Sequence, residues 1–251
     1  MVAGASEGLG QAFAASLASR GVNLLLLARR AAVLETVAEE IRSAHSVEVE
    51  VRAVDLAEPG LAEALRDLIA DRPVGLGVYN AAYAPLGALL DQPLDGLLRA
   101  VDVNVRGPVT LARILGPAMV ERGSGGLIFM SSLAGFQGSP RLATYAATKA
   151  FNTVFGESLW GELRDAGVDV LVSCAGAIRT PGYLATSHAG DPPGTLDPDA
   201  VAERTLKALG KGPRVVPGVV NQLASLFMGR LLPRRTAISI MASNTGKLKQ
   251  S

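Results

Sequence analysis

Hydrophobic residues along the chain alternate between short continuous runs and segments with helical spacing. Runs typical of strands lie at 1–3, 22–28, 47–54, 74–80, 126–132, 168–174 and 214–216. The run at 22–28 is continuously apolar and suits a strand buried on both faces of a parallel sheet, whereas 47–54 and 168–174 alternate and 47–54 has one more polar side. Helical spacing lies between them, at 11–20, 31–45, 61–70, 94–122 and 143–166. This order predicts an α/β fold, a Rossmann-type doubly wound parallel sheet of about seven strands with helices on both faces. A distortion of the fourth helix is expected around Gly107-Pro108.

Two segments in the last third of the chain break this pattern. Residues 181–198 are rich in glycine and proline and lack periodicity, which is typical of a lid or binding loop in a compact domain. Residues 219–242 form an apolar stretch that contains Arg230, Arg234 and Arg235. Such a stretch could lie on a membrane surface, but packing against a sister subunit or over a ligand cleft is the preferred interpretation. Without a linker or a repeat, residues 1–251 are expected to form a single domain.

Composition excludes several classes of protein. Half of the 251 residues (49%) are hydrophobic, which is enough for one large core. The net charge is +1, and no basic stripe with interleaved aromatic residues indicates nucleic-acid binding. Cys174 is the only cysteine and ends an apolar run, so it is expected to be a small core residue rather than a nucleophile. His45 and His188 are far apart, so no metal site is expected.

The start of the chain carries no recognisable targeting signal, and the leucine run at 24–27 is too short to span a bilayer. A cytoplasmic location is therefore expected. The chain opens Met1-Val2-Ala3-Gly4, directly on a turn that normally follows a strand. Either the first strand is very short, or the native start lies upstream.

A glycine-rich turn follows the first expected strand, with the sequence Gly4-Ala5-Ser6-Glu7-Gly8-Leu9-Gly10. Glycines at a strand-to-helix turn allow the backbone to approach a pyrophosphate, which then meets the positive end of the following helix. A glycine-rich turn alone is weak support, because many tight turns carry glycines. Its position after the first strand strengthens the prediction of a dinucleotide site.

Charged residues at two further strand ends bear on the choice of dinucleotide. Arg29 ends the second strand, where an arginine accommodates the 2'-phosphate of NADP, whereas an acidic residue would bind the ribose of NAD. Arg29 therefore favours NADP, although Glu7 is a counter-signal because a basic residue there would have strengthened the phosphate site. Arg30 fits a solvated helix start. Asp55 ends the third strand and either accepts the adenine amino group or caps the next helix.

The segment Tyr145-Ala146-Ala147-Thr148-Lys149 places a phenol and an ammonium one helical turn apart on one face. An ammonium that close favours the phenolate, so the pKa of Tyr145 is expected to be lowered and the side chain to become a usable acid or base. Tyrosine and lysine often share a solvated helix face. Lysine is scarce here, however, with five residues against 19 arginines, which favours a specific role for Lys149.

Polar residues close the fourth and fifth strands at the edge where ligands bind in open α/β sheets. They are Asn80, which precedes Ala81-Ala82, and the pair Ser131-Ser132. Asn104 lies inside a long helix, where an amide is unfavourable and needs a reason.

Taken together, these residues resemble the short-chain dehydrogenase/reductase family, in its compact single-domain branch. The resemblance extends from Gly4 to about Thr180, and Ser132 lies 13 residues before Tyr145, which is the family's usual separation and selects it over Ser131. The chain departs from the family pattern in having Ala175-Gly176 for Pro-Gly and Asn80-Ala81-Ala82 for Asn-Ala-Gly. Neither departure removes a catalytic group.

The resemblance implies a role for each matching residue. Tyr145 would be the general acid, Ser132 would orient the carbonyl oxygen, and Lys149 would hold the nicotinamide ribose. Asn104 would anchor a water that links Lys149 to solvent. Ile178 and Thr180 would contact the carboxamide of the nicotinamide. The implied cofactor-binding set is Gly4, Ser6, Gly8, Leu9, Gly10, Arg29, Asp55, Leu56, Asn80, Tyr145, Lys149, Ile178 and Thr180.

The implied activity is that of an NADPH-dependent carbonyl reductase, or of the reverse alcohol dehydrogenase, acting on a small-molecule carbonyl or alcohol. Leu86, Phe136, Tyr183 and Leu184 are candidate lining residues and favour an apolar ketone. A homodimer or homotetramer is expected by resemblance. Three alternatives stay open at this point: an NAD-dependent alcohol dehydrogenase, a catalytically silent nucleotide-binding scaffold, and an epimerase or dehydratase of nucleotide sugars. The scaffold is disfavoured by the retained Tyr145 and Lys149, and the last by the glycine spacing and chain length.

Overall fold

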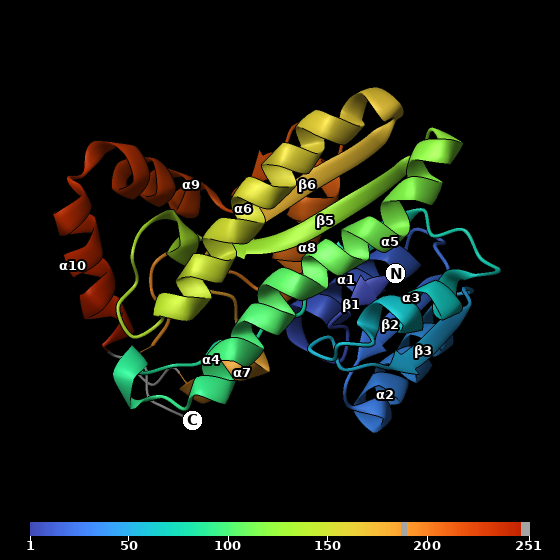
Figure 1. Ribbon diagram of the computed structural model, residues 1–251, viewed down its shortest axis with the longest axis horizontal. Coiled ribbons are helices and arrows are strands. Elements are labelled where there is room, and N and C mark those ends of the chain that lie inside the picture. Colours follow the sequence, from blue (N-terminus) through green and yellow to red (C-terminus); the bar gives the residue numbers. More distant parts are fainter. Residues whose placement is uncertain (187–189, 247–251) are drawn as a thin grey trace.

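The computed structural model describes residues 1–186 and 190–246, and its centre is a parallel sheet of seven strands (Figure 1). In spatial order the strands are β3 (Val49–Ala53), β2 (Leu24–Ala28), β1 (Val2–Ala3), β4 (Leu76–Tyr79), β5 (Gly125–Ser132), β6 (Val168–Ala175) and β7 (Arg214–Val215). Every pair in this sheet is parallel. The predicted doubly wound α/β fold is confirmed.

Strand β1 has two residues, yet it lies at the centre of the sheet. Val2 pairs with Leu26 on one side and with Val78 on the other. Both β1 residues are fully buried, because helices cover each face of the sheet. This central strand ends at the glycine-rich turn, so the turn lies where the order of the strands reverses.

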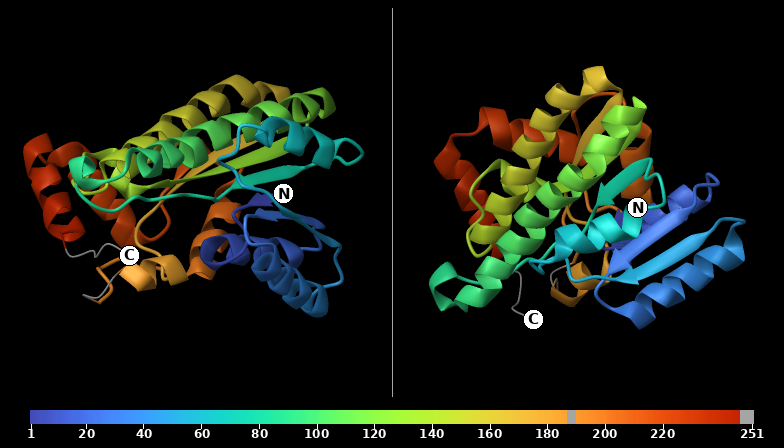
Figure 2. Two further views of the ribbon diagram at one scale, coloured as in Figure 1. Left: turned by 60° about the horizontal axis from the view of Figure 1, so that its bottom comes forward. Right: turned by 45° about the vertical axis from the view of Figure 1, so that its right-hand side comes forward.

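Helices cover both faces of the sheet (Figure 2). On one face lie α1 (Gly8–Ala18), α2 (Ala31–Ala44) and α8 (Pro198–Ala208), and on the other α3 (Leu61–Ile69), α5 (Gly107–Arg122) and α6 (Ala143–Leu163). Each face buries its own hydrophobic cluster against the sheet. Phe13 and Leu34 belong to the first cluster, and Tyr79, Leu111 and Phe129 belong to the second.

The long helix expected at 94–122 is interrupted by a wider turn. It consists of α4 (Leu94–Val101), a π-helical turn (Asp102–Arg106) and α5. Pro108 has no N–H group, so the carbonyl of Asn104 lacks the bond that it would receive in an α-helix, and the N–H of Gly107 bonds to the carbonyl of Asp102 instead. The predicted distortion is confirmed, and it lies just before Gly107-Pro108.

The segment expected as a lid contains α7 (Pro181–Thr186) and ends where α8 begins. Helix α8 adds to the predicted elements, and its start carries two ordinary signals, Asp197 at the N-cap and Pro198 in the first turn. The apolar stretch at 219–242 forms α9 (Val219–Leu226), a π-helical turn (Phe227–Leu231) and most of α10 (Arg234–Thr245). Within 1–186 and 190–246, no helix is long and apolar enough to cross a membrane.

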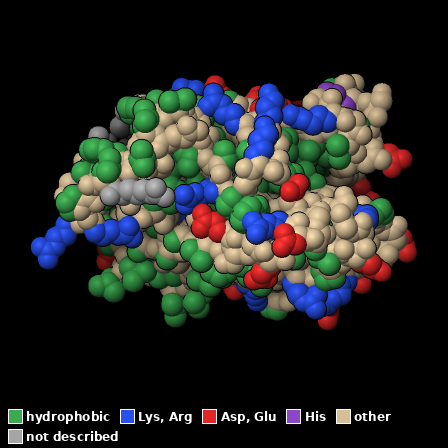
Figure 3. Space-filling view, turned by 90° about the horizontal axis from the view of Figure 1, so that it is seen from above, with side chains coloured by type: hydrophobic (Ala, Val, Ile, Leu, Met, Phe, Trp, Pro, Cys, Tyr) green, Lys and Arg blue, Asp and Glu red, His purple; other side chains and the backbone are tan. Residues whose placement is uncertain are grey.

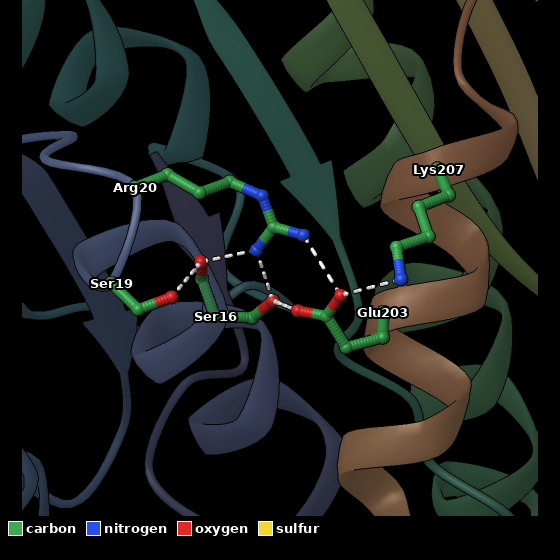
Figure 4. Close-up of polar contacts among 5 residues, drawn as sticks. All are labelled: Ser16, Ser19, Arg20, Glu203 and Lys207. Carbon is green, nitrogen blue, oxygen red and sulfur yellow. Dashed lines mark hydrogen bonds and ion pairs between the residues drawn. The ribbon is translucent and has the colours of Figure 1, made fainter.

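A polar cluster joins α8 to α1, although the two helices are far apart in sequence (Figure 4). The hydroxyl of Ser16 donates a hydrogen bond to Glu203, and Arg20 Nη2 lies 2.9 Å from Glu203 Oε2. Lys207 Nζ lies 3.6 Å from the same carboxylate. The hydrogen bonds from Arg20 and Ser16 lower the pKa of Glu203 to about 2. The cluster fixes the helix that follows the lid against the helix that follows the glycine-rich turn.

Candidate functional site

A cavity of about 470 Å³ opens at the carboxyl ends of β1 and β4. These two strands are neighbours, but the chain leaves them toward opposite faces of the sheet, which creates the crevice where such folds bind ligands. The cavity is lined by eight of the predicted cofactor residues, namely Gly4, Ser6, Gly8, Arg29, Asp55, Leu56, Asn80 and Thr180. It is also lined by Glu7, Arg30, Tyr83 and Arg99, which were not among them.

The glycine-rich turn fits closely between two other segments. A Cβ on Gly4 would lie 2.7 Å from the backbone of Ala81, and one on Gly10 would lie 1.9 Å from the carbonyl oxygen of Gly4. Gly8 has φ +57, and its Cβ would lie 2.9 Å from the side chain of Thr180. The N-cap of α1, Glu7, makes no side-chain cap bond, so the first N–H groups of the helix face the turn uncapped.

This backbone arrangement is suited to an anion such as a pyrophosphate. Leu9 contributes to it through its backbone alone, because its side chain is buried in the core. Gly10 has a packing role, because a side chain there would displace the turn. Neither residue is among those that line the cavity, so their predicted contact with a cofactor stays a prediction.

Three arginines and two acids surround the end of the cavity near β2 and β3. Arg30 Nη2 lies 2.7 Å from Glu7 Oε2, and Arg99 Nη2 lies 2.6 Å from Asp55 Oδ2. Arg30 is thus ion-paired with the acid of the glycine-rich turn. Arg29 is exposed and makes no ion pair within the described residues.

Asp55 is held as an anion at this end of the cavity. Burial raises its pKa, but the Arg99 hydrogen bond and the N–H of Ala57, 3.0 Å from Asp55 Oδ1, outweigh burial, and the pKa is lowered overall. The bond to Ala57 closes a local turn rather than capping a helix, because α3 begins at Leu61 with Gly60 at its N-cap, so the helix-cap alternative for Asp55 is wrong. No local pattern identifies this partner, since Arg99 resembles any other arginine on a solvated helix.

Ser132, Tyr145 and Lys149 come together where β5 ends and α6 begins. The hydroxyl of Ser132 accepts a hydrogen bond from the N–H of Ala134 at 3.2 Å and interacts with the phenol of Tyr145. Lys149 Nζ lies 5.6 Å from the centre of the Tyr145 ring and donates a hydrogen bond to the carbonyl of Met130 at 2.8 Å. The tyrosine and the lysine share one face of α6, as their spacing predicts.

The predicted lowering of the pKa of Tyr145 by Lys149 is wrong for this structure. Burial raises the pKa of Tyr145, and the interaction with Ser132 offsets only part of this rise. Lys149 is itself 2% exposed, and burial lowers its pKa to about 8. The ammonium bonds to the carbonyl of Met130 rather than to the phenol, so desolvation of both groups outweighs their attraction.

Ser131 and Ser132 have different surroundings. The hydroxyl of Ser131 donates to the carbonyl of Lys149 at 2.7 Å and lies 2.8 Å from Thr153 Oγ1, inside the core between β5 and α6. Ser132 is the next residue of the strand, so its side chain has the opposite direction and interacts with Tyr145. The geometry therefore agrees with the choice of Ser132 over Ser131.

Three hydrogen bonds explain why a buried amide, that of Asn104, lies inside a helix. Asn104 Oδ1 accepts a hydrogen bond from the N–H of Tyr83 at 2.8 Å, and Nδ2 donates to the carbonyl of Tyr83 at 2.8 Å and to Thr148 Oγ1 at 3.0 Å. The side chain thus joins a wall of the cavity to α6. The carbonyl of Asn104 does not receive the α-helical bond from residue 108, because Pro108 has no N–H group.

The remaining predicted residues are distributed around the lid. Ile178 packs on the core and pairs with Leu196, while Thr180 faces the cavity.

Cys174 is buried, which raises its pKa, in agreement with the expected core position. His188 lies outside the described residues. Within 1–186 and 190–246, no cluster of three or more potential metal ligands occurs.

Comparison with known proteins identifies the family. The sequence profile described as short chain dehydrogenase matches residues 1–188, about three-quarters of the chain. The chain belongs to the short-chain dehydrogenase family. The resemblance drawn from the glycine-rich turn and the Tyr145–Lys149 pair is thereby confirmed.

Two curated relatives illustrate the range of names in this family. The 7beta-hydroxysteroid dehydrogenase of Collinsella aerofaciens is 31% identical over 231 residues, which cover 88% of this chain and 86% of the relative. The very-long-chain 3-oxoacyl-CoA reductase of Podospora anserina is 36% identical over 176 residues, which cover 68% of this chain and about half (52%) of the relative. Both relatives are oxidoreductases by name.

Solved structures of the family share this fold closely. A 7beta-hydroxysteroid dehydrogenase studied for its stereoselectivity superimposes with a TM-score of 0.87 at 29% identity, covering 96% of this chain and 95% of that one. A short-chain dehydrogenase from Sphingobium yanoikuyae in complex with NADPH has a TM-score of 0.80 at 27% identity, covering 87% of each chain. A 3-oxoacyl-[acyl-carrier protein] reductase from Brucella melitensis, solved with NAD, has a TM-score of 0.74 at 26% identity and covers 87% of this chain and 89% of that one. Family neighbours thus bind either nucleotide.

Proposed function

We propose that this short-chain dehydrogenase is an NADPH-dependent reductase of a ketone or aldehyde, and that it also catalyses the reverse oxidation of a secondary alcohol. The observation that carries the proposal is the convergence of Ser132, Tyr145 and Lys149 where β5 ends and α6 begins. The three residues are not among those that line the cavity, which opens at the carboxyl ends of other strands of the same sheet. A strand-end hydroxyl and a neighbouring phenol are the two donors that a carbonyl oxygen requires when charge develops on it.

The nucleotide would be held along the cavity. The uncapped start of α1 and the glycine-rich turn fit its pyrophosphate, and Asp55 would accept the adenine amino group. Arg29, which makes no ion pair within the described part of the chain, would bind the 2'-phosphate. Ile178 and Thr180 would contact the carboxamide of the nicotinamide. When bound, NADPH supplies the hydride.

Tyr145 would donate the proton to the carbonyl oxygen of the substrate. Its raised pKa keeps the phenol protonated near neutral pH, which is the state that a donor needs. The hydroxyl of Ser132, oriented by the N–H of Ala134, would hydrogen-bond the same oxygen. Lys149 would bind the nicotinamide ribose and stabilise the phenolate that forms. Asn104 would hold the water that returns a proton from solvent.

We propose a bulky apolar ketone as the substrate. The two relatives are named for a hydroxysteroid and for a very-long-chain 3-oxoacyl-CoA, and both names denote large, mainly apolar carbonyl compounds or alcohols. Leu86, Phe136 and Tyr183 are half-buried and Leu184 is exposed, and we propose them as the lining of the substrate site. A dimer or tetramer is expected by resemblance to the family.

Two measurements test the proposal in sequence. Fluorescence titration with NADPH and NADH gives the two dissociation constants, and a panel of steroid ketones, 3-oxoacyl thioesters and simple aldehydes is then assayed with the preferred nucleotide. The expected result is tighter binding of NADPH and turnover of at least one bulky ketone. Tighter binding of NADH would contradict the role of Arg29, and nucleotide binding without turnover of any carbonyl would favour the silent scaffold.

A further inference from the structure

The chain is nearly neutral overall, but its charges are divided between two parts. Of the 24 basic and 23 acidic residues, nine basic and no acidic residues follow Glu203, so residues 1–203 have 15 basic and 23 acidic residues. The C-terminal part after Glu203 has a formal net charge of +9. Five of its basic residues lie in 219–251, a segment that contains no Asp or Glu.

Large apolar side chains are exposed in this same C-terminal part. They lie along α9 and the π-helical turn that follows it, with exposed fractions of 49% to 68% at Val219, Val220, Leu223, Leu226, Phe227 and Leu231. Their spacing of three and four residues places them on one side of the helix. Figure 3 shows hydrophobic side chains gathered at the left end of the molecule, which is the α9–α10 end in Figure 1, together with Lys or Arg side chains at its tip.

We infer that α9 and α10 form a docking surface for an anionic lipid bilayer. An amphipathic helix that combines an apolar stripe with basic residues and lacks acidic ones lies in the interface plane of a membrane, with its stripe among the acyl chains and its basic residues at the headgroups. Arg234 and Arg235 are exposed at the start of α10, directly after the stripe. This chemistry fits the anionic surface of a cytoplasmic leaflet.

The charge distribution argues against a symmetric contact of this face with a second copy. A two-fold axis would place the same patch of both subunits face to face. Arg234 and Arg235 would then lie close to their own copies, and α9 and α10 offer no acidic side chain as a partner. Phosphate headgroups supply the missing negative charge, and the acyl chains supply the apolar environment that the stripe lacks.

Vesicle co-sedimentation of the full chain tests this inference without depending on catalysis. The probes are phosphatidylcholine vesicles, with and without roughly one-third phosphatidylglycerol, at low and at high salt. Binding is expected to the anionic vesicles at low salt and to weaken at high salt. The double variant Arg234→Gln/Arg235→Gln should weaken it on the order of tenfold, and Leu223→Ser/Phe227→Ser by at least as much.

Matched variants remove the same chemistry from other faces. Arg66→Gln/Arg113→Gln removes two exposed arginines on α3 and α5, and Val33→Ser/Val120→Ser removes two exposed valines on α2 and α5. Both should bind vesicles as the wild type does, and thermal unfolding of all variants confirms that they fold. Failure of the wild type to bind anionic vesicles would overturn the inference, as would an equal loss in the matched variants. Conversion of a dimer to a monomer by Leu223→Ser/Phe227→Ser, with vesicle binding unchanged, would assign the stripe to a subunit interface and also overturn it.

Discussion

Asn104 binds both backbone polar groups of Tyr83 through its side-chain amide. Oδ1 accepts from the N–H of Tyr83 and Nδ2 donates to its carbonyl, each at 2.8 Å. Tyr83 lines the cavity, whereas Asn104 lies in the π-helical turn beside α6, where it also bonds to Thr148. This one side chain therefore fixes the cavity wall relative to the helix that carries Tyr145 and Lys149.

Replacing Asn104 with Ala should lower the free energy of unfolding by about 3 kcal/mol, because two polar groups of Tyr83 and one of Thr148 lose a buried partner. Urea unfolding followed by circular dichroism measures the loss. Thr148→Val is the matched control, since it removes one of these three bonds and should cost about 1 kcal/mol. Equal stability of the Asn104→Ala variant and the wild type would show that the amide does not hold the wall.

Alanine variants of the neighbouring Ser131 and Ser132 should differ, one losing stability and the other losing activity. Ser132→Ala should lower kcat by about 100-fold or more with little change in stability, because its hydroxyl is assigned to the developing oxyanion. Ser131→Ala should leave kcat within about threefold and lower the free energy of unfolding by about 1–2 kcal/mol, because its hydroxyl bonds to Lys149 and Thr153 in the core. Steady-state kinetics and urea unfolding of both variants provide the comparison. The reverse pattern would exchange the two roles.

Lys149 should destabilise the fold at neutral pH. Its pKa is about 8 in the folded protein and 10.5 when unperturbed, so the unfolded chain binds more protons between these values and stability rises with pH. The rise from this group amounts to about 3 kcal/mol. In Lys149→Met the rise is absent, so the stability advantage of the variant over the wild type should shrink by about that amount from pH 7 to pH 10.5.

Chemical denaturation across this pH range tests the prediction, since all other titrating groups are common to both proteins. A pH-independent difference between Lys149→Met and the wild type would mean that Lys149 is not held at a lowered pKa. The variant is also expected to lose turnover, because the group assigned to the nicotinamide ribose is gone. Stability gained together with activity lost is typical of a charge that is buried for function.

Two arginines of the cavity should affect nucleotide binding differently. Arg29→Ala should raise the Kd for NADPH by about tenfold and leave the Kd for NADH unchanged, because the residue is assigned to the 2'-phosphate. Arg99→Gln should raise both dissociation constants by the same factor, because Arg99 holds Asp55, which is assigned to the adenine shared by both nucleotides. Fluorescence titrations with both nucleotides give the four ratios. A selective loss of NADPH binding in Arg99→Gln would assign the 2'-phosphate to Arg99 on α4 instead of Arg29.

Much of the fold follows from local patterns. Continuous apolar runs such as 22–28 predict strands buried on both faces, and the spacing between Tyr145 and Lys149 predicts their common helix face. The distortion before Pro108 was predictable because proline removes one specific hydrogen bond. Helix α8 was also within reach, since Asp197-Pro198 is an ordinary helix start.

Long-range relationships could not be predicted in the same way. The pairing of Arg99 with Asp55 joins residues 44 positions apart, and no local pattern distinguishes Arg99 from other exposed arginines. Whether the pKa of Tyr145 is raised or lowered depends on two opposing effects. Desolvation of the phenol raises it, and a nearby ammonium such as that of Lys149 would lower it. The sequence spacing predicts that Lys149 is a neighbour of Tyr145, but it does not predict how far the phenol is desolvated. Here desolvation has the larger effect on the pKa.

Turnover by Tyr145→Phe, measured beside its affinity for NADPH, tests the proposed chemistry most directly. The substitution removes one oxygen atom from a half-buried side chain, so the shape of the site is retained while the proton donor is lost. We expect kcat to fall by at least about 1,000-fold and the Kd for NADPH to stay within about threefold of the wild type. Undiminished turnover by this variant would contradict the assignment of Tyr145 as the general acid.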